Sequence, residues 1–158
     1  MDETTFNCKL NNIEHLKDFN SNNLNKVRWL DVVKDYDMIK EYFKLFNVDI
    51  ESKEKNSMYF GIYINDYSGA APAKGKSCAL IYEDKILSFA VVKFKSTDSW
   101  EICAGSTHPQ HFNKGYSKAV CSFIAKYILD NKKTAICETN INNKAAQKVL
   151  QAIGMFRV

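Results

Sequence analysis

The chain has 158 residues, with 46% hydrophobic and 25% charged residues and a formal net charge of +4 at pH 7. This length and composition are typical of one globular domain, which buries roughly 70% of its unfolded surface and needs no metal or disulfide to fold. The basic residues are spread along the chain without interleaved aromatic side chains, so we expect no nucleic-acid surface.

The five cysteines narrow the class of protein further. Their number is odd and no two form a Cys-x-x-Cys pair, so we expect neither a zinc knuckle nor a disulfide framework. Most lie in apolar runs, where cysteine acts as a small buried hydrophobic residue, which fits a reducing cytosol. The first residues do not resemble a signal peptide, and no apolar run approaches the ~18–20 residues of a membrane span. We therefore expect a cytoplasmic protein with no metal and no membrane partner.

In chain order, the first third is rich in Asn and Lys, and the apolar residues of 27–46 have loosely helical spacing with a break near Asp35. The short apolar runs that follow predict strands at 58–64, 78–82, 86–94, 100–106, 134–139 and 155–158. Gly and Pro residues predict a loop at 67–76. The polar residues 83–85 predict a hairpin turn between two of the strands.

Two helices are expected in the second half of the chain. Apolar residues recur at helical spacing over 115–129 and again over 145–153. Asn142 or Asn143 is a suitable N-cap for the second helix, and Gly154 is a suitable stop. Strands and helices in this order predict one α/β or α+β domain with mixed strand directions.

The segment 107–118 joins an expected strand to the start of a long expected helix. The first turn of a helix leaves about four N–H groups without partners, and the helix dipole adds roughly half a positive charge, so an anion can bind there. Gly115 and the small Ser117 allow a diphosphate to approach the backbone, and Lys114 and Lys118 add positive charge. This pattern predicts a phosphate-binding loop.

The loop residues Phe112-Asn113-Lys114-Gly115-Tyr116-Ser117 are followed by a helix, a strand and a second helix that runs from Asn143 to an Ile-Gly-Met-Phe ending. This order and spacing resemble the GCN5-related N-acetyltransferase (GNAT) superfamily over residues 77–156. The family loop reads Arg/Gln-x-x-Gly-x-Gly/Ala, so Gly115 matches while Phe112 and Ser117 depart from it. The resemblance implies a mixed, mostly antiparallel central sheet with helices on both faces and a splayed parallel strand pair at the cofactor site.

The resemblance also implies acetyl-CoA as co-substrate. In the family the pantetheine lies between two splayed strands, here 100–107 and 134–139, and the pyrophosphate lies on the loop backbone. A backbone N–H near Ser106 and Thr107 can polarise the thioester carbonyl. The implied cofactor-binding residues are Ser106, Thr107, Phe112, Asn113, Lys114, Gly115, Tyr116, Ser117, Lys118 and Asn143.

A free amine attacks the thioester directly, and it must first lose a proton because a lysine-type ammonium has a pKa near ~10.4. Glu101 is the candidate catalytic base, directly or through water, because several family members carry a carboxylate on this strand. A solvated glutamate is the competing interpretation. Glu138 is a second candidate, and His108 could titrate near neutral pH. Leu150 stands where many family members carry a Tyr that protonates the leaving thiolate, so the acid is unassigned.

The two ends of the chain carry separate expectations. Residues 1–55 are expected to be a helical part that lines the acceptor site, and 56–158 to be the sheet and cofactor core of the same domain. Only Arg157 and Val158 follow Phe156, whereas the family fold continues with further strand structure. Either the sequence is truncated or the last strand comes from another molecule, as in a homodimer. The acceptor is expected to be an amine of a small molecule or a protein.

Two other functions remain open at this stage. A non-catalytic acyl-CoA-binding module or sensor is favoured by Phe112, Leu150 and the short end of the chain. A nucleotide triphosphatase is suggested by Gly75-Lys76-Ser77, which resemble the end of a P-loop. Its first glycine, Gly69, stands one residue too early, and the run after Ser77 predicts a strand where a P-loop needs a helix.

Overall fold

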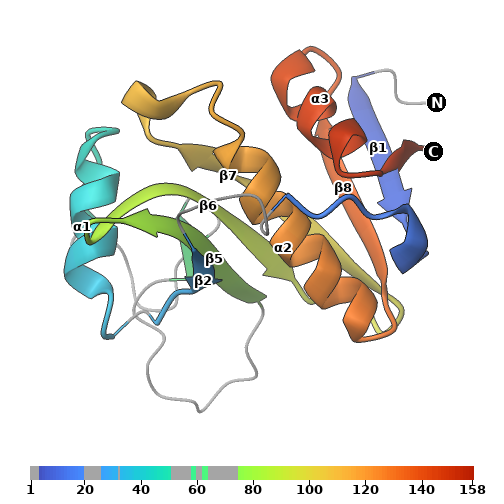
Figure 1. Ribbon diagram of the computed structural model, residues 1–158, viewed down its shortest axis with the longest axis horizontal. Coiled ribbons are helices and arrows are strands. Elements are labelled where there is room, and N and C mark those ends of the chain that lie inside the picture. The colour runs from blue at the N-terminus through green and yellow to red at the C-terminus, as the bar shows by residue number, and fades with distance from the viewer. Residues whose placement is uncertain (1–3, 20–25, 32, 51–57, 60–61, 64–74) are drawn as a thin grey trace.

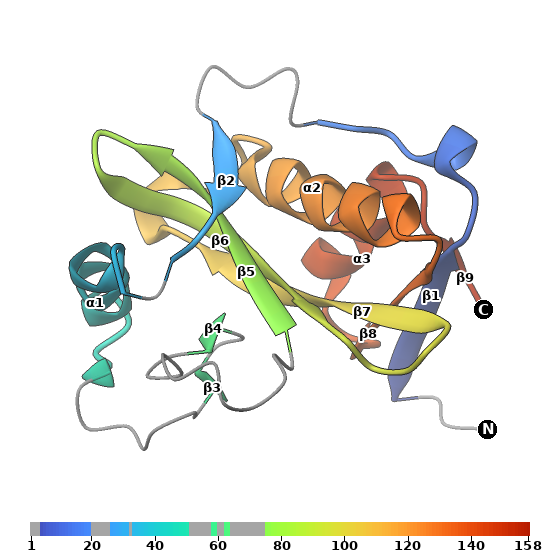
Figure 2. The ribbon, with the colours of Figure 1, turned by 90° about the horizontal axis from the view of Figure 1, so that it is seen from below.

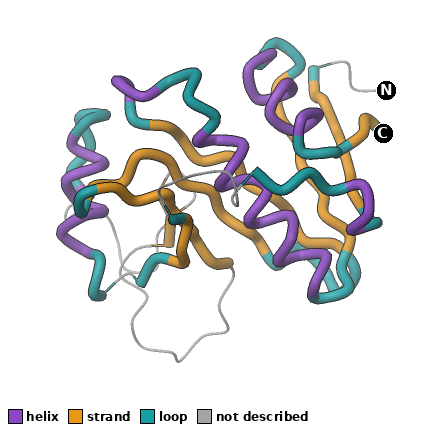
Figure 3. The backbone as a smooth tube through the Cα atoms, in the orientation of Figure 1, coloured by secondary structure: helices purple, strands orange, loops and turns teal. Residues whose placement is uncertain are grey.

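The computed structural model describes residues 4–19, 26–31, 33–50, 58–59, 62–63 and 75–158 (Figures 1 and 3). These residues form a seven-stranded sheet, a separate two-stranded pair and three α-helices. The helices are α1 (Tyr36–Lys44), α2 (Tyr116–Asp130) and α3 (Lys144–Ala152). The strands are β1 (Thr5–Leu10), β2 (Val27–Trp29), β3 (Met58–Tyr59), β4 (Ile62–Tyr63), β5 (Gly75–Tyr82), β6 (Lys85–Lys93), β7 (Ser99–Thr107), β8 (Thr134–Asn140) and β9 (Phe156–Arg157).

The large sheet is mixed and has the strand order β2-β5-β6-β7-β8-β1-β9. Its neighbouring strands are antiparallel except β7 and β8, which are parallel. Helices α2 and α3 cover one face of the sheet and α1 lies on the other (Figure 2). The expected architecture, with a mostly antiparallel sheet, helices on both faces and one parallel pair, is confirmed.

Strand β6 has apolar side chains on both faces of the sheet, which explains why helices pack on both faces. Its side chains Leu87 and Val92 belong to the core under α2 and α3, whereas Phe89 and Val91 belong to the core under α1. A strand that is apolar on both sides is typical of the centre of a covered sheet. The expected elements from residue 75 onward are confirmed within three residues at each end.

The hairpin between β5 and β6 has a two-residue turn, one residue shorter than expected. Tyr82 pairs with Lys85 across it. Glu83 and Asp84 both have left-handed φ angles, of 50° and 60°. Two left-handed residues give a turn whose twist matches that of the flanking strands, so this turn closes the hairpin without a glycine.

The helical prediction for the N-terminal part is wrong in two places. Residues 5–10 form β1, and Val27–Trp29 forms β2, which pairs with β5. In β1, Phe6, Cys8 and Leu10 are buried while Asn7 is exposed. This two-residue period is that of a strand with one buried face.

The expected break near Asp35 is present, but it separates strand β2 from α1 and not two helices, and an ion pair accounts for it. Arg28 donates two hydrogen bonds to the Asp35 carboxylate, each 2.9 Å long, and Asp35 also accepts a bond of 2.7 Å from the backbone N–H of Asp31. These bonds hold the segment between β2 and α1 in a turn. The Arg28 guanidinium, aided by the backbone bond, lowers the pKa of Asp35 below its usual value.

The run 58–64 was expected to be one strand, but its described parts pair with each other. Met58 lies opposite Tyr63 and Tyr59 opposite Ile62, so β3 and β4 form a separate antiparallel pair. Residues 60–61 and 64 lie outside the described residues, as do 67–74 of the expected loop at 67–76. Gly75 and Lys76 of that loop belong to β5.

The position beside β8 is filled by β1 of the same chain. β1 pairs antiparallel with β8 along its whole length, from Thr5 opposite Asn140 to Leu10 opposite Ala135, and with β9 on its other side. The strand expected at 155–158 is therefore confirmed as β9. Gly154, just before it, has a φ of 106°, and a side chain there would collide with the backbone oxygen of His15.

Candidate functional site

The parallel strands β7 and β8 are paired only at their beginnings. Ser99, Trp100 and Glu101 lie opposite Thr134, Ala135 and Ile136, and no later pairs connect the two strands. β7 continues to Thr107 and β8 to Asn140, so their remaining parts separate, as can be followed in Figure 1. The two strands were predicted to be splayed at 100–107 and 134–139, and this arrangement is present.

A β-bulge shapes the separated part of β7. Ser88 lies opposite Thr107 and Ala90 opposite Ala104, so one residue of β6 faces Gly105 and Ser106 of β7. A side chain at Gly105 would collide with the backbone oxygen of Phe89. A glycine at this position therefore allows β6 and the bulge to lie in close contact.

The bulge leads directly into the predicted phosphate-binding loop. A short 3-10 helix at Pro109–His111 is followed by Asn113, with a φ of 62°, and by Gly115, with a φ of 79°. Gly115 is the N-cap residue of α2, and no side chain caps this end of the helix. The first amides of a helix have no partner within it, and the helix dipole makes this end positive.

The backbone conformation at residue 115, and not close neighbouring atoms, explains why this residue is a glycine. Its φ lies in the left-handed region, which disfavours residues with a Cβ. Among the residues that the structure describes, apart from the chain next to Gly115, no atom lies within 4 Å of the place that a Cβ would occupy, so the space above Gly115 is open. The loop therefore presents its backbone to open space at the positive end of α2.

The other loop side chains lie around this backbone. Phe112 is exposed, and Lys114 lies with its Nζ 3.0 Å from His111 Nδ1. Tyr116 is half-buried against the core, and Lys118 lies with its Nζ 5.5 Å from the ring centre of Phe19. The half-buried Ser117 lies in the first turn of α2.

His108 is held by a local hydrogen bond. Its Nδ1 accepts a hydrogen bond of 3.1 Å from the backbone N–H of Gln110. Partial burial, with the neighbouring His111 and Lys85, lowers the pKa of His108 below its usual value. The neutral imidazole therefore predominates at neutral pH, and His108 acts as the cap of the 3-10 helix.

Glu101 lies on the last paired rung of β7, where the separation from β8 begins. Its side chain is 17% exposed, and Lys95 Nζ lies 3.2 Å from its Oε2. The thiol of Cys103 donates a bond of 3.5 Å to Oε1. Burial raises the pKa of Cys103 to about 12, so this thiol keeps its proton. Glu101 raises the pKa of Lys95, and the exposed Glu138 of β8 adds to that effect.

A contact that the sequence did not reveal joins α1 to the bulge. The Tyr42 hydroxyl and Ser106 Oγ are 2.6 Å apart, although the residues are 64 positions apart in sequence. The buried Ser88 donates a bond of 3.2 Å to the carbonyl oxygen of Ser106 and is hydrogen-bonded to Thr107 Oγ1 at 3.0 Å. A tyrosine in an amphipathic helix is usually a packing residue, so no sequence signal pointed to Tyr42.

Two predicted positions in α3 have structural roles. Asn143 is the N-cap of α3, and its side chain accepts a bond of 3.1 Å from the N–H of Ala146, as expected for one of the two cap candidates. Leu150 is buried in the core under α2 and α3. Its hydrocarbon side chain has no proton to give to a leaving group.

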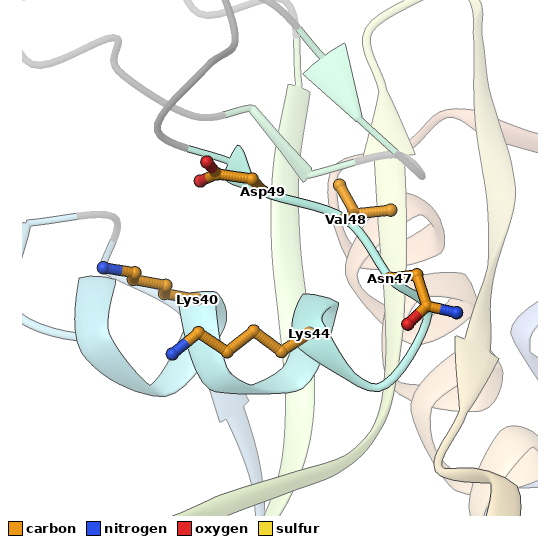
Figure 4. Close-up of a pocket in the computed structure, with 5 residues that line it drawn as sticks. All are labelled: Lys40, Lys44, Asn47, Val48 and Asp49. Atoms are coloured by element: carbon orange, nitrogen blue, oxygen red, sulfur yellow. The ribbon is translucent and has the colours of Figure 1, made fainter.

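An open surface pocket of about 360 Å³ lies at the end of α1 and is lined by Lys40, Lys44, Asn47, Val48 and Asp49 (Figure 4). Lys44 also pairs with Glu41 at 2.9 Å. None of the residues of the separated strands or of the loop lines this pocket. It therefore does not extend the candidate site.

The P-loop interpretation is wrong. Gly75, Lys76 and Ser77 lie within strand β5, so no helix N-terminus follows them. The Nζ of Lys76 lies 4.2 Å from the ring centre of Trp29, and a cation over an aromatic face is attracted to it.

Within the described residues, no helix is long and apolar enough to cross a bilayer, and no group of three or more His, Cys, Asp or Glu side chains is placed to hold a metal ion.

Comparison with solved structures identifies the fold as that of the GNAT superfamily. The structure of a GNAT-family protein from Novosphingobium aromaticivorans matches with a TM-score of 0.69 at 8% identity, over 98% of this chain and 59% of that one. A GCN5-related N-acetyltransferase-like protein from Streptococcus suis matches with a TM-score of 0.62 at 14% identity, over 98% and 57%. The chain thus spans less than two thirds of these proteins.

A shorter protein gives a more even match. An aminoglycoside acetyltransferase from an uncultured soil metagenomic sample matches with a TM-score of 0.56 at 11% identity, over 81% of this chain and 86% of that one. No protein-family model and no curated protein sequence matches the chain. At these identities the likeness establishes the fold, and the chemistry must be argued from the residues of this chain.

Proposed function

We propose that this protein is an N-acetyltransferase that moves the acetyl group of acetyl-CoA to a primary amine. One observation carries the proposal: the separated strands β7 and β8 lie next to the uncapped N-terminus of α2, where Gly115 leaves open space. A strand gap beside a phosphate-binding helix end suits a ligand with an extended arm and a diphosphate.

In this proposal the pyrophosphate accepts hydrogen bonds from the backbone of residues 112–118, with Lys114 and Lys118 adding charge. The pantetheine lies along the separated part of β7, beside Ser106 and Thr107. The bulge there changes the direction of the backbone N–H groups. An N–H that points at the thioester carbonyl stabilises the negative charge that develops on its oxygen.

Glu101 is the proposed base for the acceptor amine. The acceptor enters as an ammonium ion, and Glu101 already holds a cation, the Lys95 ammonium, at 3.2 Å. The Lys95 side chain is exposed, so an incoming ammonium can displace it from the largely buried Glu101 carboxylate. Glu101 then takes a proton from the acceptor, directly or through water, and the free amine attacks the thioester. The acceptor class that fits this site is a cationic amine.

The second candidate function is an acyl-CoA-binding module without catalysis. The buried Leu150 favours it, because the position that carries a tyrosine in many GNAT enzymes has no proton to give here. The two candidates share the cofactor site and differ only in whether transfer occurs.

Mass spectrometry of acetyl transfer from acetyl-CoA separates them. A suitable acceptor panel is spermidine, lysine, kanamycin and a lysine-containing peptide. We expect transfer by the wild-type protein and a decrease of kcat by about 100-fold in Glu101→Gln, because general-base catalysis contributes 10²–10⁴-fold. Glu14→Gln is the control and should stay within about threefold of the wild type, since Glu14 is exposed and lies outside the candidate site. Binding of acetyl-CoA without transfer to any amine would favour the module.

A further inference from the structure

The hydroxyl pair of Tyr42 and Ser106 connects the buried face of α1 with the separated part of β7. Tyr42 is 2% exposed, and its ring packs edge-on against Phe43, Phe46 and Phe89, with ring centres 5.4 to 5.8 Å apart. The phenol oxygen lies 2.6 Å from Ser106 Oγ. A buried phenol hydroxyl needs a hydrogen-bond partner, and Ser106 is the partner here.

The direction of this hydrogen bond follows from the chemistry of the two hydroxyls. A phenol is a stronger acid than an aliphatic alcohol and is therefore the better donor of the pair. Burial raises the pKa of Tyr42 to about 12, so the phenol keeps its proton at every pH where proteins normally work. When Tyr42 donates to Ser106 Oγ, the proton of Ser106 remains available for a third group.

Ser106 is held in a fixed place on the separated part of β7. Its carbonyl oxygen accepts a bond from the buried Ser88, and its neighbour Gly105 lies in contact with the backbone of Phe89. Ser106 itself is half-buried and lies beyond the last β7–β8 pair, Glu101 with Ile136. The serine hydroxyl is therefore fixed beside the gap where the proposed function places the thioester.

Resting on that proposed function, we propose that Ser106 donates its hydroxyl proton in a hydrogen bond to the sulfur of the departing CoA, and that Tyr42 is the positioning residue that orients it. The amine nitrogen attacks the carbonyl carbon, the C–S bond breaks, and the sulfur keeps the bonding electrons. Glu101, after passing the proton of the entering ammonium to water, accepts the second proton that the nitrogen loses on attack. The thiolate is stabilised by the Ser106 O–H and takes its own proton from water after release.

Hydrogen bonding, and not proton transfer, is the role that suits this pair. A free thiol has a pKa near ~8.5, so a thiolate does not remove the proton of a hydroxyl as weakly acidic as that of Tyr42 or Ser106. A charged acceptor strengthens a hydrogen bond, and the sulfur becomes charged only as the C–S bond breaks. The pair therefore acts mainly on kcat. The two hydroxyls lie on α1 and β7, whereas Leu150, the position without a proton donor, lies on α3.

The test measures acetyl transfer, acetyl-CoA affinity by calorimetry and thermal unfolding for Tyr42→Phe, Ser106→Ala and the double variant. With the best acceptor of the panel above, we expect each single change to lower kcat by about 10- to 100-fold while Kd for acetyl-CoA changes less than threefold. The double variant should be no slower than the slower single variant, because both changes remove one unit. Ser106→Thr, which keeps a hydroxyl, should retain kcat within about fivefold. Tyr82→Phe, on an exposed tyrosine, is the matched control.

The outcomes separate this inference from the function on which it rests. Normal kcat in Tyr42→Phe, additive effects in the double variant, or a loss confined to Kd or to thermal stability would overturn the inference and leave the acetyltransferase proposal intact. No transfer by the wild-type protein to any amine of the panel would overturn both. A decrease of kcat shared by the two single variants, with Ser106→Thr active, would support the inference.

Discussion

The two parts of the candidate site depend on different parts of the chain. The phosphate-binding loop at the start of α2 relies on backbone: a left-handed glycine, uncapped amides and a helix dipole, all within one stretch of sequence. The other part of the site relies on side chains: Tyr42 of α1 meets Ser106 of β7, 64 positions away, and Lys95 pairs with Glu101. The first tolerates exchange of most side chains, whereas the second depends on individual oxygen and nitrogen atoms.

The departures from the family loop pattern illustrate this tolerance. Phe112 and Ser117 replace the usual residues, yet the loop keeps its left-handed glycine and its open space. A backbone site of this kind keeps its geometry while its sequence changes. A side-chain site is lost when one atom is removed, so single-atom substitutions are the appropriate probes for it.

The largest expected effect is on the loop. Gly115→Val should lower acetyl-CoA affinity by more than about 100-fold, because a β-branched residue is strained at positive φ and its side chain enters the space left for the diphosphate. Calorimetry with acetyl-CoA measures this. Asn113→Gly is the matched control: it removes a side chain at another left-handed position and should change Kd less than about threefold.

Gly115→Asn separates backbone strain from blocking of the diphosphate, because asparagine adopts left-handed φ more readily than valine. If the side chain blocks the diphosphate, Gly115→Asn should also bind poorly. Unchanged affinity in both Gly115 variants would show that the cofactor does not lie on this loop.

A second, smaller effect concerns the stability of the α1 side. Arg28 lowers the pKa of Asp35 in the folded protein, so the ion pair stabilises the fold fully above about pH 3.8, the ordinary pKa, and this stabilisation is lost as the pH falls through the lower folded value. Asp35→Asn should therefore lower the free energy of unfolding by about 1–3 kcal/mol at pH 7. Denaturant unfolding at pH 7 and near ~2 measures the difference, which should shrink at the lower pH. A difference independent of pH would contradict the ion-pair explanation.

The smallest expected effect is at Lys95. Replacing Lys95 with Met removes the cation that competes with the acceptor ammonium for Glu101, so KM for the acceptor should fall by about two- to fivefold, as exposed ion pairs are worth about 0.2–1 kcal/mol. Steady-state kinetics at low and high salt measures this, and salt should reduce the difference. Lys126→Met, which removes the exposed lysine of another ion pair, that with Asp130 on α2, serves as the control. A higher KM in Lys95→Met would instead indicate that Lys95 helps to bind the acceptor.

The sequence predicted the second half of the fold well because its signals are local. The glycine at 115, the stripe over 145–153 and the cap Asn143 each follow from a few neighbouring residues, and the structure confirms them. The N-terminal part failed for the opposite reason. β1 is six residues long and β2 three, and each becomes a strand only by pairing with a segment more than 45 residues away. The contact between Tyr42 and Ser106 belongs to the same class of long-range information.

The place of β1 also affects how the protein forms during synthesis. β1 is made well before its partner β8, which ends at Asn140. Cys8 and Cys137, which lie opposite each other, are separated by 129 positions. Contacts of such long range slow folding, and an unpaired strand invites pairing with other chains. The sheet beside β8 can therefore be completed only after the residues up to Asn140 have been made, and until then β1 is exposed to misassembly.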